Sequence, residues 1–133
     1  MTARSKARKR ALDVLFAADL RGDSAIEALE TAIADGEGPT NAYTETLVRG
    51  VVAEQERIDA LLSEHAQGWT LDRMPGVDRN VLRLGVYEML YVDDVPDAVA
   101  VAEAVALAQD LSTDDSASFV NGVLGAVLRQ TAG

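Results

Sequence analysis

The stretch from Val77 to Val92 places the strongest constraint on how this chain can fold. Its apolar residues point to nearly all sides of a helix, and they are Val81, Leu82, Leu84, Val86, Met89 and Leu90. A surface helix keeps a polar face, whereas a helix that is apolar nearly all round is covered by its neighbours. The sequence therefore predicts a helix over 77–92 at the centre of a helical protein.

The remaining apolar residues also recur at helical spacing, and no stretch alternates with the period of a strand. Gly22 predicts the end of the first helix, and Ser24 predicts the cap of the second. We expect helices over about 5–21, 24–35, 41–66 and 96–110, a short helical turn or connector in WTLDRMPG (69–76), and a last helix after the cap in STDD (112–115). The chain of 133 residues is thus predicted to be all-α, with about seven helices in one domain over 1–133.

Three glycines, Gly85, Gly122 and Gly125, lie inside these helical patterns. A glycine within a helix costs about 1 kcal/mol of stability relative to alanine. We expect close approach of neighbouring helices to compensate for this cost at all three positions.

The residues that enzymes use most often are scarce. Cysteine is absent, which excludes disulfides, thiolate zinc sites and cysteine nucleophiles. His65 is the only histidine. Neither common phosphate-binding glycine motif is present. Asp93, Asp94 and Asp97 cluster beside a helix start, where acids usually balance the helix dipole. The sequence predicts no enzyme, no catalytic residue, no cofactor and no metal site. The lack of cysteine and of long apolar runs predicts a cytoplasmic protein.

The charges are divided unevenly along the chain. The formal net charge is -10, yet residues 1–10 contain five of the twelve basic residues and none of the 22 acidic ones. This basic head consists of Arg4, Lys6, Arg8, Lys9 and Arg10. Positive charge at a helix start opposes the helix dipole. Composition alone leaves three interpretations of the basic head open: a solvated tail, an anion-binding site, or a contact with an acidic membrane surface. Arginine-rich segments and the free N–H groups of a helix start both favour the binding of phosphate. The acidic remainder suggests a basic partner.

A second unusual stretch is STDDSASFVNGVL (112–124). It begins as a helix cap with acids in the first turn and continues to a core-facing Phe119. Asn121 is a poor helix former whose side chain needs hydrogen-bond partners. The spacing does not decide whether those partners are internal or belong to a ligand.

Three stretches resemble the NusB family of bacterial transcription antitermination factors. They are ARKRALDVLF (7–16), VDRNVLRLGVYEML (77–90), and DVP (94–96) followed by AVAVAEAVALAQDLSTDDSASFVNGVLGAVL (98–128). GWTLDRMPGVDR (68–79) resembles actinobacterial members in particular. The resemblance implies an all-helical fold of two small bundles around a central apolar helix, and it implies no catalysis.

The resemblance also implies partners. Members of this family pair with NusE, which is also a small-subunit ribosomal protein, and the pair binds the boxA sequence of nascent ribosomal RNA leaders. The complex then helps RNA polymerase to resist termination, together with other Nus factors. The resemblance assigns RNA contacts to the basic head, that is to Arg4, Lys6, Arg8, Lys9 and Arg10, and also to Ser118, Phe119 and Asn121. It assigns partner contacts to Asp115 and Asp78.

Two alternatives stay open at this point. A NusB-like domain also forms the front of ribosomal-RNA cytosine methyltransferases, so the chain is alternatively a detached RNA-binding module of that kind, without a cysteine to attack the cytosine ring. The other alternative is a homodimer of the free protein whose interface covers the basic head.

Overall fold

The computed structural model describes residues 2–66 and 68–132, which contain six α-helices and no strand. The helices are α1 (Ala3–Arg21), α2 (Ala25–Ala34), α3 (Ala42–His65), α4 (Gly76–Tyr91), α5 (Asp97–Leu111) and α6 (Asp114–Ala132). The all-α prediction is confirmed, but the expected count of about seven is one too high. Residues 69–75 form turns and bends but no helix, and Gly76 already begins α4. Pro75 disfavours a helical backbone at Met74.

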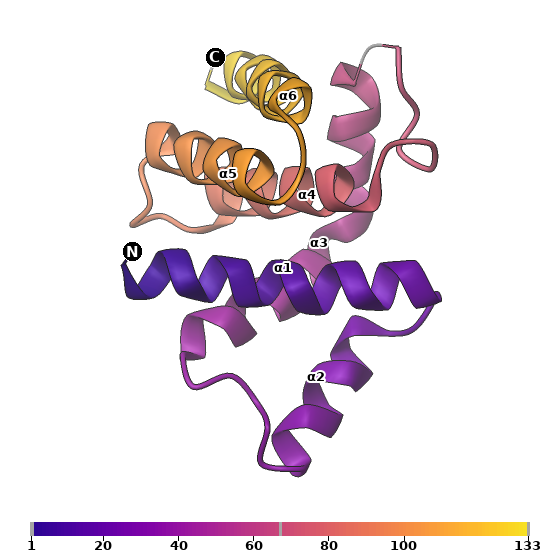
Figure 1. Ribbon diagram of the computed structural model, residues 1–133. Coiled ribbons are helices and arrows are strands. Elements are labelled where there is room, and N and C mark those ends of the chain that lie inside the picture. The colour runs from indigo at the N-terminus through magenta and orange to yellow at the C-terminus, as the bar shows by residue number, and fades with distance from the viewer. Residues whose placement is uncertain (1, 67, 133) are drawn as a thin grey trace.

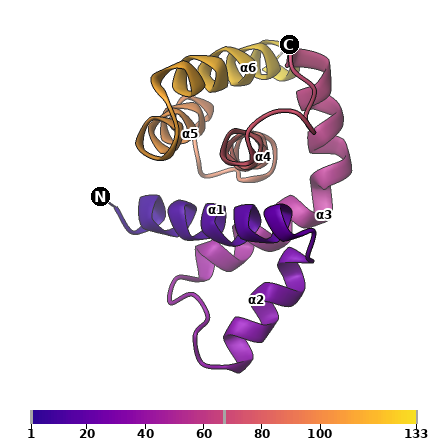
Figure 2. The same cartoon turned by 45° about the vertical axis from the view of Figure 1, so that its right-hand side comes forward.

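The six helices form two groups that meet along α1 (Figure 1). On one side, α2 and the first part of α3 pack together; on the other side lie α4, α5 and α6. α3 is long enough to run from the first group into the second, as the rotated view shows (Figure 2). The structure therefore contains the two small bundles that the family resemblance implies.

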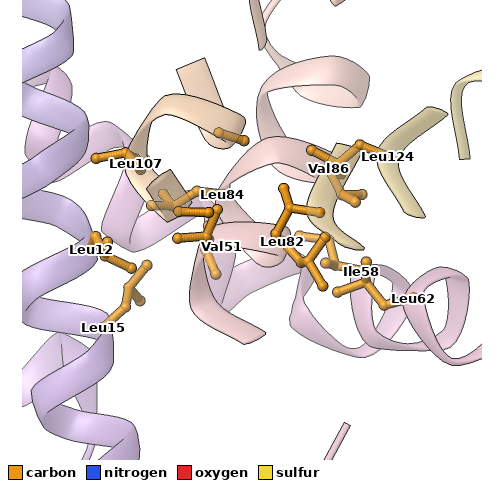
Figure 3. Close-up of a cluster of buried hydrophobic side chains, with 14 of the residues drawn as sticks. Leu12, Leu15, Val51, Ile58, Leu62, Leu82, Leu84, Val86, Leu107 and Leu124 are labelled. Atoms are coloured by element: carbon orange, nitrogen blue, oxygen red, sulfur yellow. The ribbon is translucent and has the colours of Figure 1, made fainter. Parts of the chain in front are cut away.

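The central position predicted for the apolar helix is confirmed. α4 packs against α1, α3, α5 and α6, and all of its residues from 80 to 86 are buried. Leucines, valines and one isoleucine from α4 and the four helices packed against it meet in one cluster (Figure 3). The labelled members are Leu12, Leu15, Val51, Ile58, Leu62, Leu82, Leu84, Val86, Leu107 and Leu124. Burial of such aliphatic side chains supplies the main free energy that holds the two groups together. Within the described residues, no helix is both long and apolar enough to cross a membrane.

The end of α1 is fixed by a polar contact with α4. Arg79 Nε and Asn80 Nδ2 donate to Asp19 Oδ2 at 2.8 and 2.9 Å. Burial alone would raise the pKa of Asp19, but these hydrogen bonds and the nearby arginine charges lower it. Gly22 then ends α1 in the left-handed conformation, with φ of 72°, as the sequence predicts.

Close helix packing explains one of the three helical glycines. A Cβ at Gly85 would lie 2.8 Å from Leu124 Cδ1 and 3.3 Å from Ala104 Cβ, so α4 approaches α5 and α6 closely there. A Cβ at Gly122 would meet no atom within 4 Å, and one at Gly125 would meet only Arg129 Nη1, at 3.5 Å. The expectation of close approach is therefore wrong for Gly122 and Gly125, which lie on the outer side of α6.

Gly85→Ala is expected to lower the free energy of unfolding by about 1 kcal/mol, because overpacking the core outweighs the gain in helix propensity. Gly122→Ala is the matched control, since it adds the same methyl group to a helix in open space. It should raise the free energy of unfolding by about 0.5–1 kcal/mol. Urea denaturation measures both values, and equal stabilisation by the two substitutions would contradict this account of the packing.

Candidate nucleic-acid interface

The basic head forms the first turns of α1, and the geometry of the helix divides its five cations between two faces. Arg4 and Arg8 are four residues apart and therefore share one face, which lies against the rest of the protein. Lys6, Lys9 and Arg10 share the opposite face, and all three are exposed. Only this outer group points fully to solvent.

Arg8 is a buried structural residue. Its side chain is 4% exposed, and its Nε donates to Glu88 Oε1 and Oε2 at 2.7 and 3.0 Å. The Tyr43 hydroxyl donates to the same carboxylate at 2.5 Å. Burial would lower the pKa of Arg8, but its hydrogen bond with Glu88 and the charge of that carboxylate raise it. Arg8 is thus removed from the residues expected to contact RNA, because its guanidinium is already enclosed and paired.

The exposure of Arg4 is intermediate between that of the buried Arg8 and that of the exposed outer group. Its Nη1 and Nη2 donate to Asp94 Oδ1 and Oδ2 at 3.2 and 3.1 Å, and its guanidinium carbon lies 4.2 Å from the centre of the Tyr43 ring. The side chains of Arg4 and Asp94 are 42% and 69% exposed. The backbone around it is also fixed, since Asn41 Nδ2 donates to the Ala3 carbonyl at 3.2 Å. The head is therefore an anchored helix start and not a solvated tail.

The two acids assigned to the partner surface differ in position. Asp78 is fully buried, and Ser116 Oγ donates to its Oδ2 at 2.8 Å. Asp115 is exposed in the first turn of α6, directly before Ser116. The Ser116–Asp78 hydrogen bond joins the starts of α6 and α4, so Asp78 positions the turn that presents Asp115. A buried carboxylate cannot form a surface contact, and direct contact by Asp78 is not supported.

The second stretch assigned to RNA lies on the outer side of α6. Ser118 and Asn121 are exposed, and Phe119 is half-buried. Trp69, which the sequence placed in the helical turn or connector before the central helix, packs edge-to-face on Phe119 with ring centres 5.3 Å apart. Trp69 is 42% exposed. Beside this pair lies a hollow of about 330 Å³, lined by His65, Ser118, Phe119, Gly122, Val123, Ala126 and Arg129.

The basic head and this α6 surface are separate. α4 and α5 lie between α1 and α6 in both views (Figures 1 and 2). Asp115 and Ser118, by contrast, are three residues apart on α6 and are therefore neighbours on one side of that helix. The structure thus joins the expected partner contact to the α6 surface and leaves the basic head as a second, distinct region.

Comparison with known proteins gives one consistent result. The sequence profile of the NusB family matches residues 5–129. The chain is 72% identical over 129 residues to the transcription antitermination protein NusB of Nocardioides sp. strain JS614, covering 97% of this chain and 96% of the relative. It is similar to NusB of T. maritima, with a TM-score of 0.85, 34% identity and coverage of 97% and 92%. It is also similar to a chain in a crystal structure of the antitermination factors NusB and NusE with double-stranded RNA, with a TM-score of 0.82, 30% identity and coverage of 96% of each chain.

Arg8→Ala is expected to lower the free energy of unfolding by about 3–5 kcal/mol, because it leaves the Glu88 carboxylate buried without its cation. Lys9→Ala removes an equal charge from the exposed face and should change the free energy of unfolding by less than about 0.5 kcal/mol. Guanidinium denaturation distinguishes the two substitutions. Equal and small effects would show that the Arg8–Glu88 pair is not the anchor of the head.

Proposed function

Because the chain belongs to the NusB family, we propose that it is a transcription antitermination factor that binds RNA together with NusE. The RNA is the single-stranded boxA sequence of nascent ribosomal RNA leaders. The complex helps RNA polymerase to resist termination with other Nus factors. The protein acts without catalysis or cofactor, and it works in the cytoplasm, where the nascent RNA is made.

The observation that carries this proposal is the exposed row of Lys6, Lys9 and Arg10 on a chain with a formal net charge of -10. The acidic body repels RNA at long range, so affinity has to come from a local cationic surface. Phosphate contacts fix the position of an RNA strand but carry no sequence information. The head therefore supplies affinity, and sequence recognition falls to other groups.

The α6 surface is suited to that second task. Single-stranded bases are recognised by stacking on aromatic rings and by hydrogen bonds to their edges. Phe119 and the exposed Trp69 offer aromatic surface, and Ser118 and Asn121 offer hydrogen-bonding groups beside it. NusE completes the recognition from the neighbouring turn, where Asp115 presents a negative charge to a basic ribosomal protein.

The relatives of this chain are antitermination factors, which favours this function over a detached module of a cytosine methyltransferase. A homodimer that covers the basic head would hide Lys6, Lys9 and Arg10. Sedimentation of the free protein with and without RNA tests that arrangement, because such a dimer has to dissociate when RNA binds.

Replacing Lys6, Lys9 and Arg10 together by alanine tests the RNA surface. In the NusE complex, the slope of log affinity for boxA RNA against log salt concentration should fall in magnitude by about 2, that is by about 0.7 for each phosphate that is no longer neutralised. The matched control is the replacement of the exposed Arg21, Arg57 and Arg73 by alanine, which changes the net charge equally outside the head. An unchanged slope and affinity in the head variant would overturn the assignment.

Asp115→Lys tests the partner surface. The reversed charge should slow association with NusE and weaken the complex, because charges at an interface rim act mainly on the association rate. Asp114→Lys is the control, since it makes the same charge change in the same first helical turn. Circular dichroism should remain that of the wild type for both variants. Association rates reduced equally by the two substitutions would argue against a specific contact by Asp115.

A further inference from the structure

Arg4 is a cation of the basic head that could bind RNA, but it forms an exposed ion pair with Asp94. Asp94 accepts hydrogen bonds from both terminal nitrogens of Arg4, at 3.2 and 3.1 Å. A guanidinium binds a phosphate group through two parallel N–H donors of the same kind. In this structure a carboxylate therefore takes one of the two edges of Arg4 that can bind a phosphate.

The pair is poorly explained as a stabilising contact. Exposed ion pairs contribute little to the stability of a fold, and both side chains of this pair are substantially exposed. The start of α1 is already fixed by the buried Arg8–Glu88 pair, by the Asn41–Ala3 contact and by a hydrogen bond from Thr44 Oγ1 to the Ala7 carbonyl. Removing Asp94 would leave these anchors in place.

The surroundings of Arg4 keep it available once Asp94 releases it. Its guanidinium lies over the Tyr43 ring, which holds the side chain at the surface by a cation–π contact. It borders a hollow of about 460 Å³ whose lining includes Thr2, Pro96 and Val99. Arg8, the other cation on this face of α1, is buried and paired with Glu88. Of these two cations, Arg4 is the one whose side chain is still substantially exposed.

We propose that Asp94 competes with RNA phosphate for Arg4 and thereby sets the RNA affinity of the basic head. RNA either displaces the carboxylate from Arg4 or binds another edge of the guanidinium against the repulsion of Asp94. By either route, Asp94 lowers the affinity of Arg4 for phosphate. This inference rests on the proposed function, since it requires that the head binds RNA.

The test is the affinity of the NusE complex for boxA single-stranded RNA at several salt concentrations, with Asp94→Asn. This substitution removes the charge and keeps an acceptor oxygen. The affinity should rise about threefold to tenfold at about 0.1 M salt. The salt slope should stay close to that of the wild type, because by either route Arg4 already contacts phosphate in the wild-type complex.

Asp93→Asn is the matched control. Asp93 is exposed, adjacent to Asp94, and forms no ion pair with the residues that the structure describes. It should raise the affinity by less than about twofold, through long-range repulsion alone. Thermal unfolding of both variants should stay close to that of the wild type.

A double-mutant cycle with Arg4→Ala shows whether the effect passes through Arg4. In the Arg4→Ala background, Asp94→Asn should give no more gain than Asp93→Asn. The proposal is overturned if Asp94→Asn lowers the affinity, if it matches Asp93→Asn, or if its gain persists without Arg4; in each case RNA binding itself still stands. If the wild-type complex does not bind boxA RNA, the proposed function and this inference both fall.

Discussion

The buried ion pair between Arg8 and Glu88 determines how the basic head is presented. It joins the start of α1 to the central helix α4, with the guanidinium and the carboxylate almost completely enclosed. A buried charge without its partner is strongly destabilising, so this contact fixes the rotation of α1 about its own axis. Once Arg8 points inward, helix geometry directs Lys6, Lys9 and Arg10 outward. At the other end of α1, the contacts of Asp19 with Arg79 and Asn80 fix the same helix against α4.

The distribution of charge follows from this arrangement. Two of the five cations of the head face acids of the chain itself: Glu88 is buried with Arg8, and Asp94 faces Arg4 at the surface. The outer face of the head is free of such partners among the residues that the structure describes. The chain thus combines a small cationic surface with an acidic body. It separates the surface where phosphate is expected from the surface on α6 where bases and a basic partner are expected. RNA that uses both regions has to span the surface between α1 and α6.

Local sequence predicted most of the fold, because the features involved are local. Gly22 ends α1, Ser24 accepts a hydrogen bond from the backbone of Glu27, and the apolar residues of 77–92 make α4 the central helix. The site was predicted less well. The buried position of Arg8 requires its pairing with Glu88, which is 80 residues away in the chain. The buried carboxylate of Asp78 accepts a hydrogen bond from Ser116, which is also distant in the chain. The contact of Trp69 with Phe119 also joins distant segments. No periodicity or cap signal carries such information, so basic and acidic residues that look equivalent in the sequence divide into anchors and surface groups only after packing.

The most direct test of this account is the binding of boxA single-stranded RNA by the purified protein with and without NusE, compared with a permuted RNA of the same length. The account predicts weak binding by the protein alone, and binding by the NusE complex that is at least about tenfold tighter and depends on the boxA sequence. Equal affinity for the permuted RNA, or no gain on adding NusE, would contradict it.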